Sequence, residues 1–234
     1  MSPLSLPARL SALSALVPKG SRVADIGTDH ALLPIYLIEN GITDSVIASD
    51  IAQGPLDSAK KNISAHGLLH KITLVKSDGI VKVYPLSPET IIIAGMGGET
   101  IRDIISDCDY SVSSSPLFLL QPMTHAELLR QYLIENGFSI LSESVIQEQH
   151  RFYVIIAAQH KDIQQHYFKE DAVSKSLIYE LGGIMPQSCE AARNYLLWRK
   201  ETAKRARDGL LKSQDEFDRA KEFSELIEEI DRRL

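Results

Sequence analysis

The sequence has few cysteines, one tryptophan and no long apolar run. Cys108 and Cys189 are too far apart to suggest a disulfide framework or a zinc ligand set, so we expect two reduced thiols and no bound metal. No apolar stretch approaches the roughly 20 residues that a membrane-spanning helix needs. The first residues lack the charged start and apolar centre of a signal peptide. We therefore expect a cytoplasmic protein, monomeric and not bound to a membrane.

The chain is long enough for one good hydrophobic core and an appendage, since it has 234 residues of which 44% are hydrophobic. Its net charge of −6 argues against a protein that is basic throughout. A local basic face could still bind nucleic acid, because electrostatic attraction depends on how charge is distributed.

Strand-like and helical segments alternate over the first two thirds of the chain. Five strands are expected, at 21–23, 45–50, 72–76, 90–94 and 116–120. Two further strands at 140–147 and 152–158 are separated by a short link, which favours an antiparallel hairpin. This order predicts an α/β fold, with a doubly wound, mostly parallel seven-stranded sheet and helices on both faces.

From about residue 161 the alternation stops and only helices are expected, at 169–181, 188–212 and 215–234. Apolar residues recur at seam spacing in the last two of these helices. The seam residues are Leu196, Ala203, Leu210, Phe217, Ala220, Ile227, Ile230 and Leu234. The sequence thus predicts two domains, residues 1–160 and a small helical coiled-coil domain of residues 161–234.

Charge is polarised within this helical region. The segment 189–212 has seven basic and three acidic residues, whereas 213–234 has four basic and eight acidic residues. The basic helix could contact a phosphate backbone, or its charges could pair with the acidic helix beside it, and the sequence leaves both open. The candidate phosphate contacts are Arg193, Arg199, Lys200, Lys204, Arg205 and Arg207.

Acidic or glycine-rich segments stand at the ends of the first four expected strands. In an open α/β sheet, ligands bind beyond the carboxyl ends of the strands. An acid after the second strand can accept hydrogen bonds from ribose hydroxyls, and an acid after the third can bind an adenine amino group. The four segments therefore indicate an adenosine-containing cofactor: Asp25-Ile26-Gly27, Ser49-Asp50-Ile51, Ser77-Asp78-Gly79 and Ala94-Gly95-Met96-Gly97.

The sequence of the loop after the first strand distinguishes between two kinds of adenosine-containing cofactor. A nicotinamide dinucleotide favours three glycines in the pattern Gly-x-Gly-x-x-Gly, which packs a pyrophosphate against the helix. Here the segment from Gly27 to Leu32 has one glycine, and Asp29 would place negative charge near a diphosphate. Asp25 and Asp29 suit a ligand with a positive end, and S-adenosylmethionine has an ammonium group, a sulfonium and no phosphate.

The same segments, with others between residues 10 and 158, resemble the bacterial tRNA adenine N1-methyltransferase family TrmK. One departure is that the second strand often ends in Gly-Glu in this family, where this chain has Ser49-Asp50. The residues that carry the resemblance are Asp25 to Pro34, Gly54-Pro55, Asn62, His66-Gly67, Asp78-Gly79, Ile93 to Gly98, Gln121-Pro122 and Arg151 to Tyr153.

The resemblance implies a Rossmann-like methyltransferase domain, a C-terminal coiled coil, S-adenosylmethionine as cofactor and tRNA as partner. It implies methyl transfer to N1 of the adenine at position 22. Gly95 and Met96 would then lie beside the incoming base, and Asp29 or His30 could help remove a proton from N6 after transfer. The implied cofactor-binding residues are Asp25, Gly27, Thr28, Asp29, His30, Asp50, Ile51, Asp78, Gly79, Ala94, Gly95, Met96 and Gly97.

Two other functions stay open on the residues alone. The first is an NAD(P)-dependent oxidoreductase, against which the single glycine of the first loop argues. The second is a non-catalytic nucleotide-binding protein whose coiled coil recruits a partner. Phe152 and Tyr153 are expected in the core or in a pocket wall, with stacking on a target base as the alternative.

Overall fold

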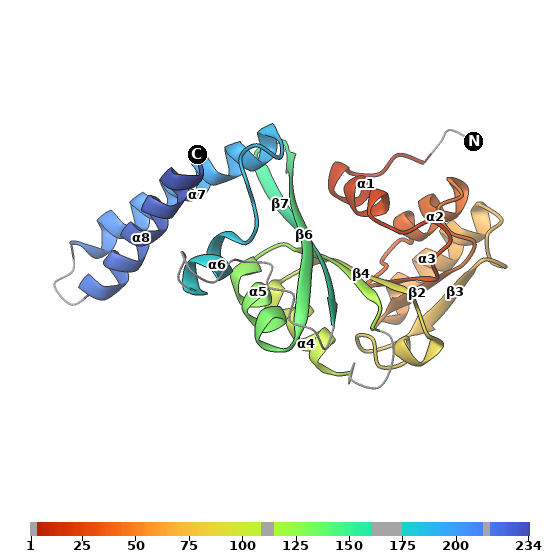
Figure 1. The fold of residues 1–234 in the computed structure, drawn as a ribbon. Helices are drawn as coiled ribbons and strands as arrows, with labels where there is room; N and C mark the ends of the chain where they lie inside the picture. Colours follow the sequence, from red (N-terminus) through yellow and green to blue (C-terminus); the bar gives the residue numbers. More distant parts are fainter. Residues whose placement is uncertain (1–3, 109–114, 161–174, 213–215) are drawn as a thin grey trace.

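A computed structural model describes residues 4–108, 115–160, 175–212 and 216–234 (Figure 1). Seven strands form one sheet in the order β3-β2-β1-β4-β5-β7-β6. The first five in chain order pair in parallel, whereas β7 is antiparallel to both β5 and β6. The expected fold class is therefore confirmed, including the antiparallel hairpin at the end of the sheet.

The later strands lie close to their expected ranges, but the expected range of the first strand was wrong, since the strand begins at Val23 and includes Asp25 and Ile26. The strands are β1 (Val23–Ile26), β2 (Val46–Asp50), β3 (Ile72–Lys76), β4 (Thr90–Met96), β5 (Leu117–Pro122), β6 (Phe138–Glu148) and β7 (Arg151–His160). The helices are α1 (Ala8–Ala15), α2 (Leu32–Glu39), α3 (Gln53–Ala65), α4 (Gly98–Ser106), α5 (Ala126–Glu135), α6 (Lys175–Leu181), α7 (Glu190–Leu210) and α8 (Phe217–Arg233), with a short 3-10 helix η1 (Tyr84–Leu86).

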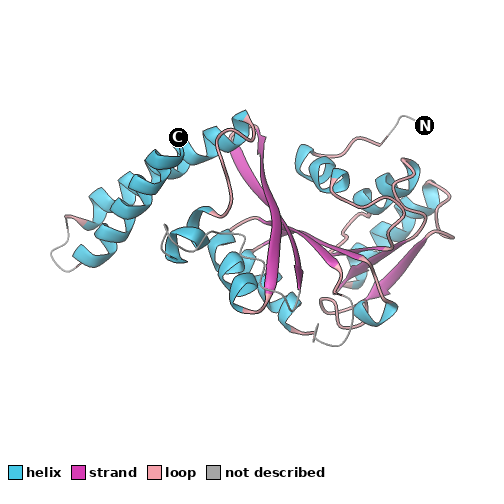
Figure 2. Ribbon diagram, in the orientation of Figure 1, coloured by secondary structure: helices cyan, strands magenta, loops and turns pink. Residues whose placement is uncertain are grey.

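Helices cover both faces of the sheet (Figure 2). Alternate residues of β4 point to opposite faces, so Ile92 packs with α1, α2 and α3, whereas Ile91 and Ile93 pack with α4 and α5. All three isoleucines are fully buried. Burial on both faces explains why β4 reads as a continuous apolar run.

Helices α7 and α8 form an antiparallel pair that extends away from the sheet (Figure 1). Their buried seam contains Leu196, Ala203, Ala220, Ile227 and Ile230, as expected. Phe217 is 70% exposed, so its expected place in the seam is wrong, because it begins α8 beyond the packed part of the pair. The boundary at residues 160 and 161 stays a prediction, and 161–174 lie outside the described residues.

A buried ion pair connects the sheet to this helical region. Nε of Arg130 on α5 donates to Oε1 of Glu143 on β6 at 2.7 Å, and both side chains are fully buried. Nη1 of Arg130 donates to the Tyr179 and Glu180 carbonyls of α6, and the Gly183 amide donates to Glu143. Burial alone would lower the pKa of Arg130, but Glu143 and Tyr195 together more than offset this and raise it.

Removing one partner of this pair should strongly destabilise the fold. Arg130→Met leaves the Glu143 carboxylate buried without its cation, which typically costs about 3–5 kcal/mol. The free energy of unfolding, measured in urea, should fall by this amount, and Arg130→Met with Glu143→Gln should recover part of it. Lys221→Gln is the control, because its ion pair with Glu225 is exposed and should contribute little. A loss below about 1 kcal/mol in Arg130→Met would contradict the assigned role.

Candidate functional site

The sheet order places β1 in the interior of the sheet, with β2 on one side and β4 on the other. The crossover direction reverses between β1 and β4, since β2 and β3 continue to one side and β5 to the other. A crevice at the carboxyl ends of the strands is expected at such a switch point. The residues after β1, β2, β3 and β4 that the sequence singled out therefore lie along one edge of the sheet.

The turn after β1 has an unusual backbone. Gly27, Asp29 and Ala31 have φ angles of 75°, 49° and 56°, a region that favours glycine and is strained for the other two residues. The amides of Gly27 and Thr28 both donate to the Ser49 carbonyl of β2, at 2.8 and 2.9 Å. The turn is thus fixed to the end of β2 immediately before α2 begins.

Asp25 is the buried acid of the site. Desolvation raises the pKa of its carboxyl to about 6, the nearby Thr28 side chain lowers it in part, and the charge of Asp50 raises it further. The Thr28 and Ser49 hydroxyls are buried and have no hydrogen-bond partner among the described residues. Ser49 is the register partner of Ile26, so its hydroxyl lies on the other face of the sheet from Asp25. A buried acid at the end of β1 fits a polar ligand with a cationic group.

The residues after β2 and β3 are more accessible. Asp50 is half-buried, and its Oδ1 accepts a hydrogen bond from the Ala52 amide at 2.9 Å, which leaves Oδ2 for a ligand. Asp78 is exposed, and Ile51 is 61% exposed. Gly79 has a φ of 52°, and a Cβ there would approach Ile104 at 3.3 Å. These residues present carboxylate oxygens and apolar surface at the edge, which suits a nucleoside.

The segment after β4 approaches the turn after β1. A Cβ on Gly27 would collide with the Met96 side chain, so Met96 lies directly over Gly27. Gly95 has a φ of 78°, and the pairing of β4 with β5 shifts in register between Ala94 and Met96. The structure therefore brings Gly27 and Met96, which are far apart in the sequence, into one place.

Gln121 holds this segment, although sequence reasoning gave it no role beyond the resemblance. Its side chain is fully buried, its Oε1 accepts from the Gly95 amide at 3.2 Å, and its Nε2 donates to the Pro122 carbonyl at 3.1 Å. A polar residue at the end of an apolar strand was the signal that could have identified it. Gly98 allows a second close approach, because a Cβ there would collide with the His125 backbone.

Asp29 and His30 lie at the solvent side of the turn. Their side chains are 67% and 55% exposed, and His30 Nε2 is 3.5 Å from Asp29 Oδ2. Asn62 on α3 donates to the His30 carbonyl at 3.0 Å and so fixes the backbone rather than the imidazole. The two side chains are accessible to a substrate that approaches the edge.

Four of the six candidate phosphate contacts on α7 pair with carboxylates of this chain. Arg199 pairs with Glu180, and Lys200 pairs with Asp231 of α8. Lys204 pairs with Glu201 and Arg207 with Asp208 on α7 itself, both at 2.8 Å. Arg193 and Arg205 are exposed and have no ion pair within the described part of the chain. Internal pairing therefore accounts for four of the six cations, and the contact of this helix with a phosphate backbone stays a prediction.

No group of three or more potential metal ligands occurs among the residues that the structure describes. In the same ranges, no helix combines the length and apolar character that crossing a bilayer requires.

Comparison with known proteins agrees with this geometry. Residues 6–156 match the family described as "Methyltransferase domain". The chain is 32% identical to a tRNA (adenine(22)-N(1))-methyltransferase of Bacillus subtilis, over 75% of this chain and 73% of that protein. The crystal structure of the B. subtilis m1A22 tRNA methyltransferase TrmK superposes with a TM-score of 0.85, at 26% identity over 98% of each chain.

A second solved structure carries a ligand. A putative tRNA (m1A22) methyltransferase from Streptococcus pneumoniae, in complex with S-adenosyl-L-methionine, superposes with a TM-score of 0.78. It is 28% identical, and the match covers 95% of this chain and all of that one. This likeness extends over the helical region as well as the sheet.

The buried Asp25 carboxyl should reduce stability at neutral pH. Because its pKa is raised from 3.8 to about 6, the native state binds the extra proton between these values, and stability falls as pH rises through this window. Asp25→Asn removes the buried charge. Without ligand and above pH 6, its free energy of unfolding should therefore exceed that of the wild type by up to about 3 kcal/mol. The gain should vanish below pH 4. Urea unfolding of both proteins across this range tests it, and a gain that is independent of pH would contradict it.

Proposed function

The chain belongs to the family of bacterial tRNA (adenine(22)-N(1))-methyltransferases, and we propose that it methylates N1 of adenine 22 in tRNA with S-adenosylmethionine as the methyl donor. The observation that carries this proposal is the buried Asp25 carboxyl at the switch point of the sheet, directly before the turn that the Ser49 carbonyl fixes. A dinucleotide would instead need a glycine-rich turn for its pyrophosphate, which Asp29 and Ala31 do not provide.

Particular residues would hold this cofactor. Asp25 and the turn at Gly27 to His30 would face its ammonium end, since their charge is negative and the turn is fixed to β2. Asp50 would accept hydrogen bonds from the ribose hydroxyls beside Ile51. Asp78 and Gly79 would bind the adenine. When bound, S-adenosylmethionine supplies an electrophilic methyl group on its sulfonium.

The segment from Ala94 to Gly97 would place the target adenine. N1 of adenine carries no proton at neutral pH, so no base has to act before attack and positioning can provide much of the rate. N1 lies on the pairing edge, so the base must be unpaired or turned out of its stack. Gln121 fixes the Gly95 amide, and Met96 lies over Gly27, so this segment is well placed to hold the base beside the methyl-binding region.

Asp29 and His30 would act after transfer. Methylation at N1 leaves a cationic adenine whose N6 proton can be removed, and an exposed carboxylate beside an imidazole can accept it. Their shared exposure and the 3.5 Å separation support this role.

The surface that binds tRNA would use Arg193 and Arg205 of α7 more than the four paired cations. A paired cation must lose its carboxylate before it neutralises a phosphate, whereas an unpaired one need not. We also propose that residues 161–234 act as a separate domain for tRNA binding, and that the protein works in the cytoplasm as a monomer without a metal.

Methylation of tRNA is the direct test. The full chain with unmodified bacterial tRNA and S-adenosylmethionine should yield 1-methyladenine at position 22 by mass spectrometry, and no product should form with NAD. Absence of product in tRNA to which the protein binds would contradict the proposed reaction.

Asp78→Ala should weaken cofactor binding by about tenfold, because one hydrogen bond involving a charged group is worth about 1.5–3 kcal/mol and this site is exposed. Calorimetry with S-adenosylmethionine measures it. Asp44→Ala is the matched control, since Asp44 is an exposed carboxylate that precedes β2, at the opposite edge of the sheet. Equal affinity in Asp78→Ala and the wild type would remove Asp78 from the site.

Separate replacement of the unpaired and the paired cations of α7 should show which of them contact tRNA. Arg193→Gln with Arg205→Gln should lower tRNA affinity and reduce the salt dependence of binding by about two phosphate contacts. Lys204→Gln with Arg207→Gln removes the same formal charge and should have a smaller effect. If both pairs change the salt dependence equally, net charge rather than pairing governs binding.

A further inference from the structure

Trp198 of α7 has one exposed side, and its ring packs against two other aromatic rings. Its side chain is 47% exposed, and its ring centroid lies 5.8 Å from that of Phe152 and 5.9 Å from that of Tyr195. The interplanar angles are 39° and 35°, and Phe152 and Tyr195 pack edge to face at 5.9 Å. Tyr195 is buried and Phe152 half-buried, so these two rings hold Trp198 in place while its outer surface meets solvent.

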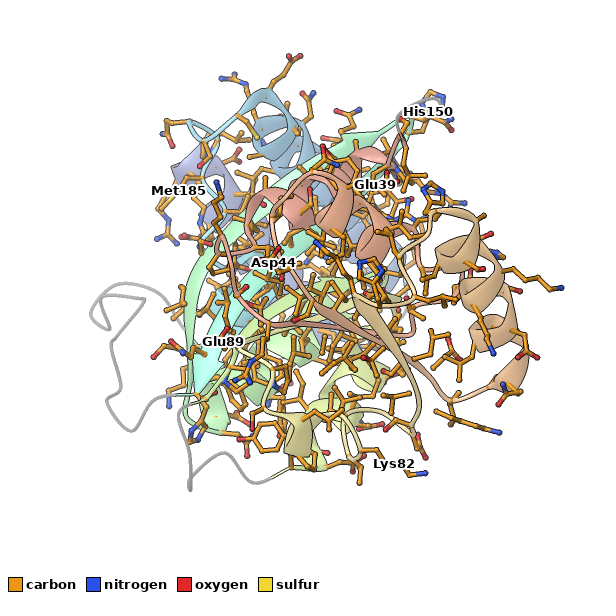
Figure 3. The ribbon with its side chains drawn as sticks, turned by 90° about the vertical axis from the view of Figure 1, so that its right-hand side faces the viewer. Glu39, Asp44, Lys82, Glu89, His150 and Met185 are labelled. Carbon is orange, nitrogen blue, oxygen red and sulfur yellow. The ribbon has the colours of Figure 1, made fainter. Side chains whose placement is uncertain are left out.

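This cluster lies at the edge of the sheet that carries the candidate active site. Leu120 of β5 is opposite Ile156 of β7, and β5 ends two residues later at Pro122. Because β7 is antiparallel, its first residues extend beyond that end, and Phe152 lies about 7 Å past it. In Figure 3, Asp44 and Glu89, which precede β2 and β4, lie to the left, whereas His150 in the hairpin turn lies to the right.

The start of α7 is fixed to this overhanging hairpin. The Asn194 side chain donates to Gln147 at 3.4 Å, and the Cys189 thiol lies 3.9 Å from the Val145 carbonyl. On the other side of the hairpin, Arg9 of α1 pairs with Glu148 at 3.2 Å and its guanidinium lies 5.5 Å from the Tyr153 ring centre. Figure 1 shows α1 and α7 on the two sides of β6 and β7. Trp198 therefore has a fixed position relative to the catalytic edge.

We propose that the exposed face of Trp198 stacks on an unpaired base of the substrate tRNA. The inference rests on the proposed function and names a contact within it. Stacking on an aromatic ring is the usual way in which unpaired bases are bound, and it tolerates any base because each has a π-face. Arg205 lies two helical turns further along the same face of α7, exposed and without an ion pair among the described residues, so a phosphate of the same strand can be bound there.

The charge of the platform fits RNA better than an apolar partner protein. Arg205 is an exposed cation on the same face of α7 as Trp198 and has no ion pair in the described ranges. Arg151 and Phe152 are consecutive in β7 and so point to opposite faces of the hairpin, and Arg193 lies about 140° around α7 from Trp198. An exposed tryptophan with an exposed cation two turns further along the same helix face is typical of a surface that binds single-stranded nucleic acid.

Fluorescence gives a direct test, because Trp198 is the only tryptophan of the chain. Titration of the full chain with unmodified tRNA should quench its fluorescence, with saturation at the concentration where filter binding saturates. A blunt-ended RNA duplex of similar length, which has no unpaired bases, should quench far less at the same salt concentration. Quenching by tRNA but not by paired RNA supports stacking on Trp198, and equal quenching by paired RNA would overturn it.

Substitutions provide the second test. Trp198→Ala should weaken tRNA binding by about 5- to 100-fold, whereas Trp198→Phe, which keeps a ring, should retain most of the affinity. Leu197→Ala is the matched control, since Leu197 is also exposed on α7 but points about 100° away. Calorimetry with S-adenosylmethionine should give the same cofactor affinity in all three variants.

The outcomes separate this proposal from the one on which it rests. If the wild type methylates tRNA while its fluorescence does not change, the platform is wrong and the proposed function stands. If the wild type binds no tRNA, both are overturned. If Trp198→Ala fails to fold, the fluorescence titration of the wild type still tests the proposal. The tRNA affinities of Trp198→Phe and Leu197→Ala test it as well, because a larger loss of affinity in Leu197→Ala would contradict stacking by Trp198.

Discussion

The site depends on the pairing of β1 with a parallel strand on each side. β1 has only four residues, all buried, and it is hydrogen-bonded to β2 and β4 along its whole length. The chain must therefore leave the sheet within one or two residues of Ile26, and the Ser49 carbonyl of β2 receives both amides of that turn. The positive φ angles at Gly27, Asp29 and Ala31 follow from this constraint, and so does the burial of Asp25.

The same constraint makes the site costly for the fold without ligand. A buried carboxyl with a raised pKa, two unsatisfied hydroxyls and two non-glycine residues in the left-handed region all oppose folding. The isoleucines of β4 and the Arg130–Glu143 pair stabilise the chain elsewhere, where no ligand is expected. A pre-formed polar site lowers the stability of the fold, and the hydrophobic core has to compensate for this. Different parts of the sheet therefore stabilise the fold and form the binding site.

The sequence predicted the fold and the strand ends well because both depend on local patterns. The apolar run of β4, the acids Asp50 and Asp78, and the single glycine of the first turn are visible without any tertiary contact. Pairing between distant residues was not visible. The ion pair of Lys200 with Asp231 spans 31 residues, and Gln121 reaches Gly95 only because β4 and β5 are adjacent. Phe217 obeyed the seam spacing but lies beyond the packed part of α8.

The position of Trp198 limits how α7 can contribute to recognition. α7 has 21 residues and so a length of about 30 Å, and its first turns are fixed to the hairpin beside the catalytic edge. Cations further along can bind phosphates of many RNA shapes, because phosphate contacts carry little sequence information. A ring at the fixed end can accept a base only where the strand is unpaired. If Trp198 stacks on a base as proposed, the near end of α7 would select an unpaired region of the tRNA, and cations further along would increase affinity.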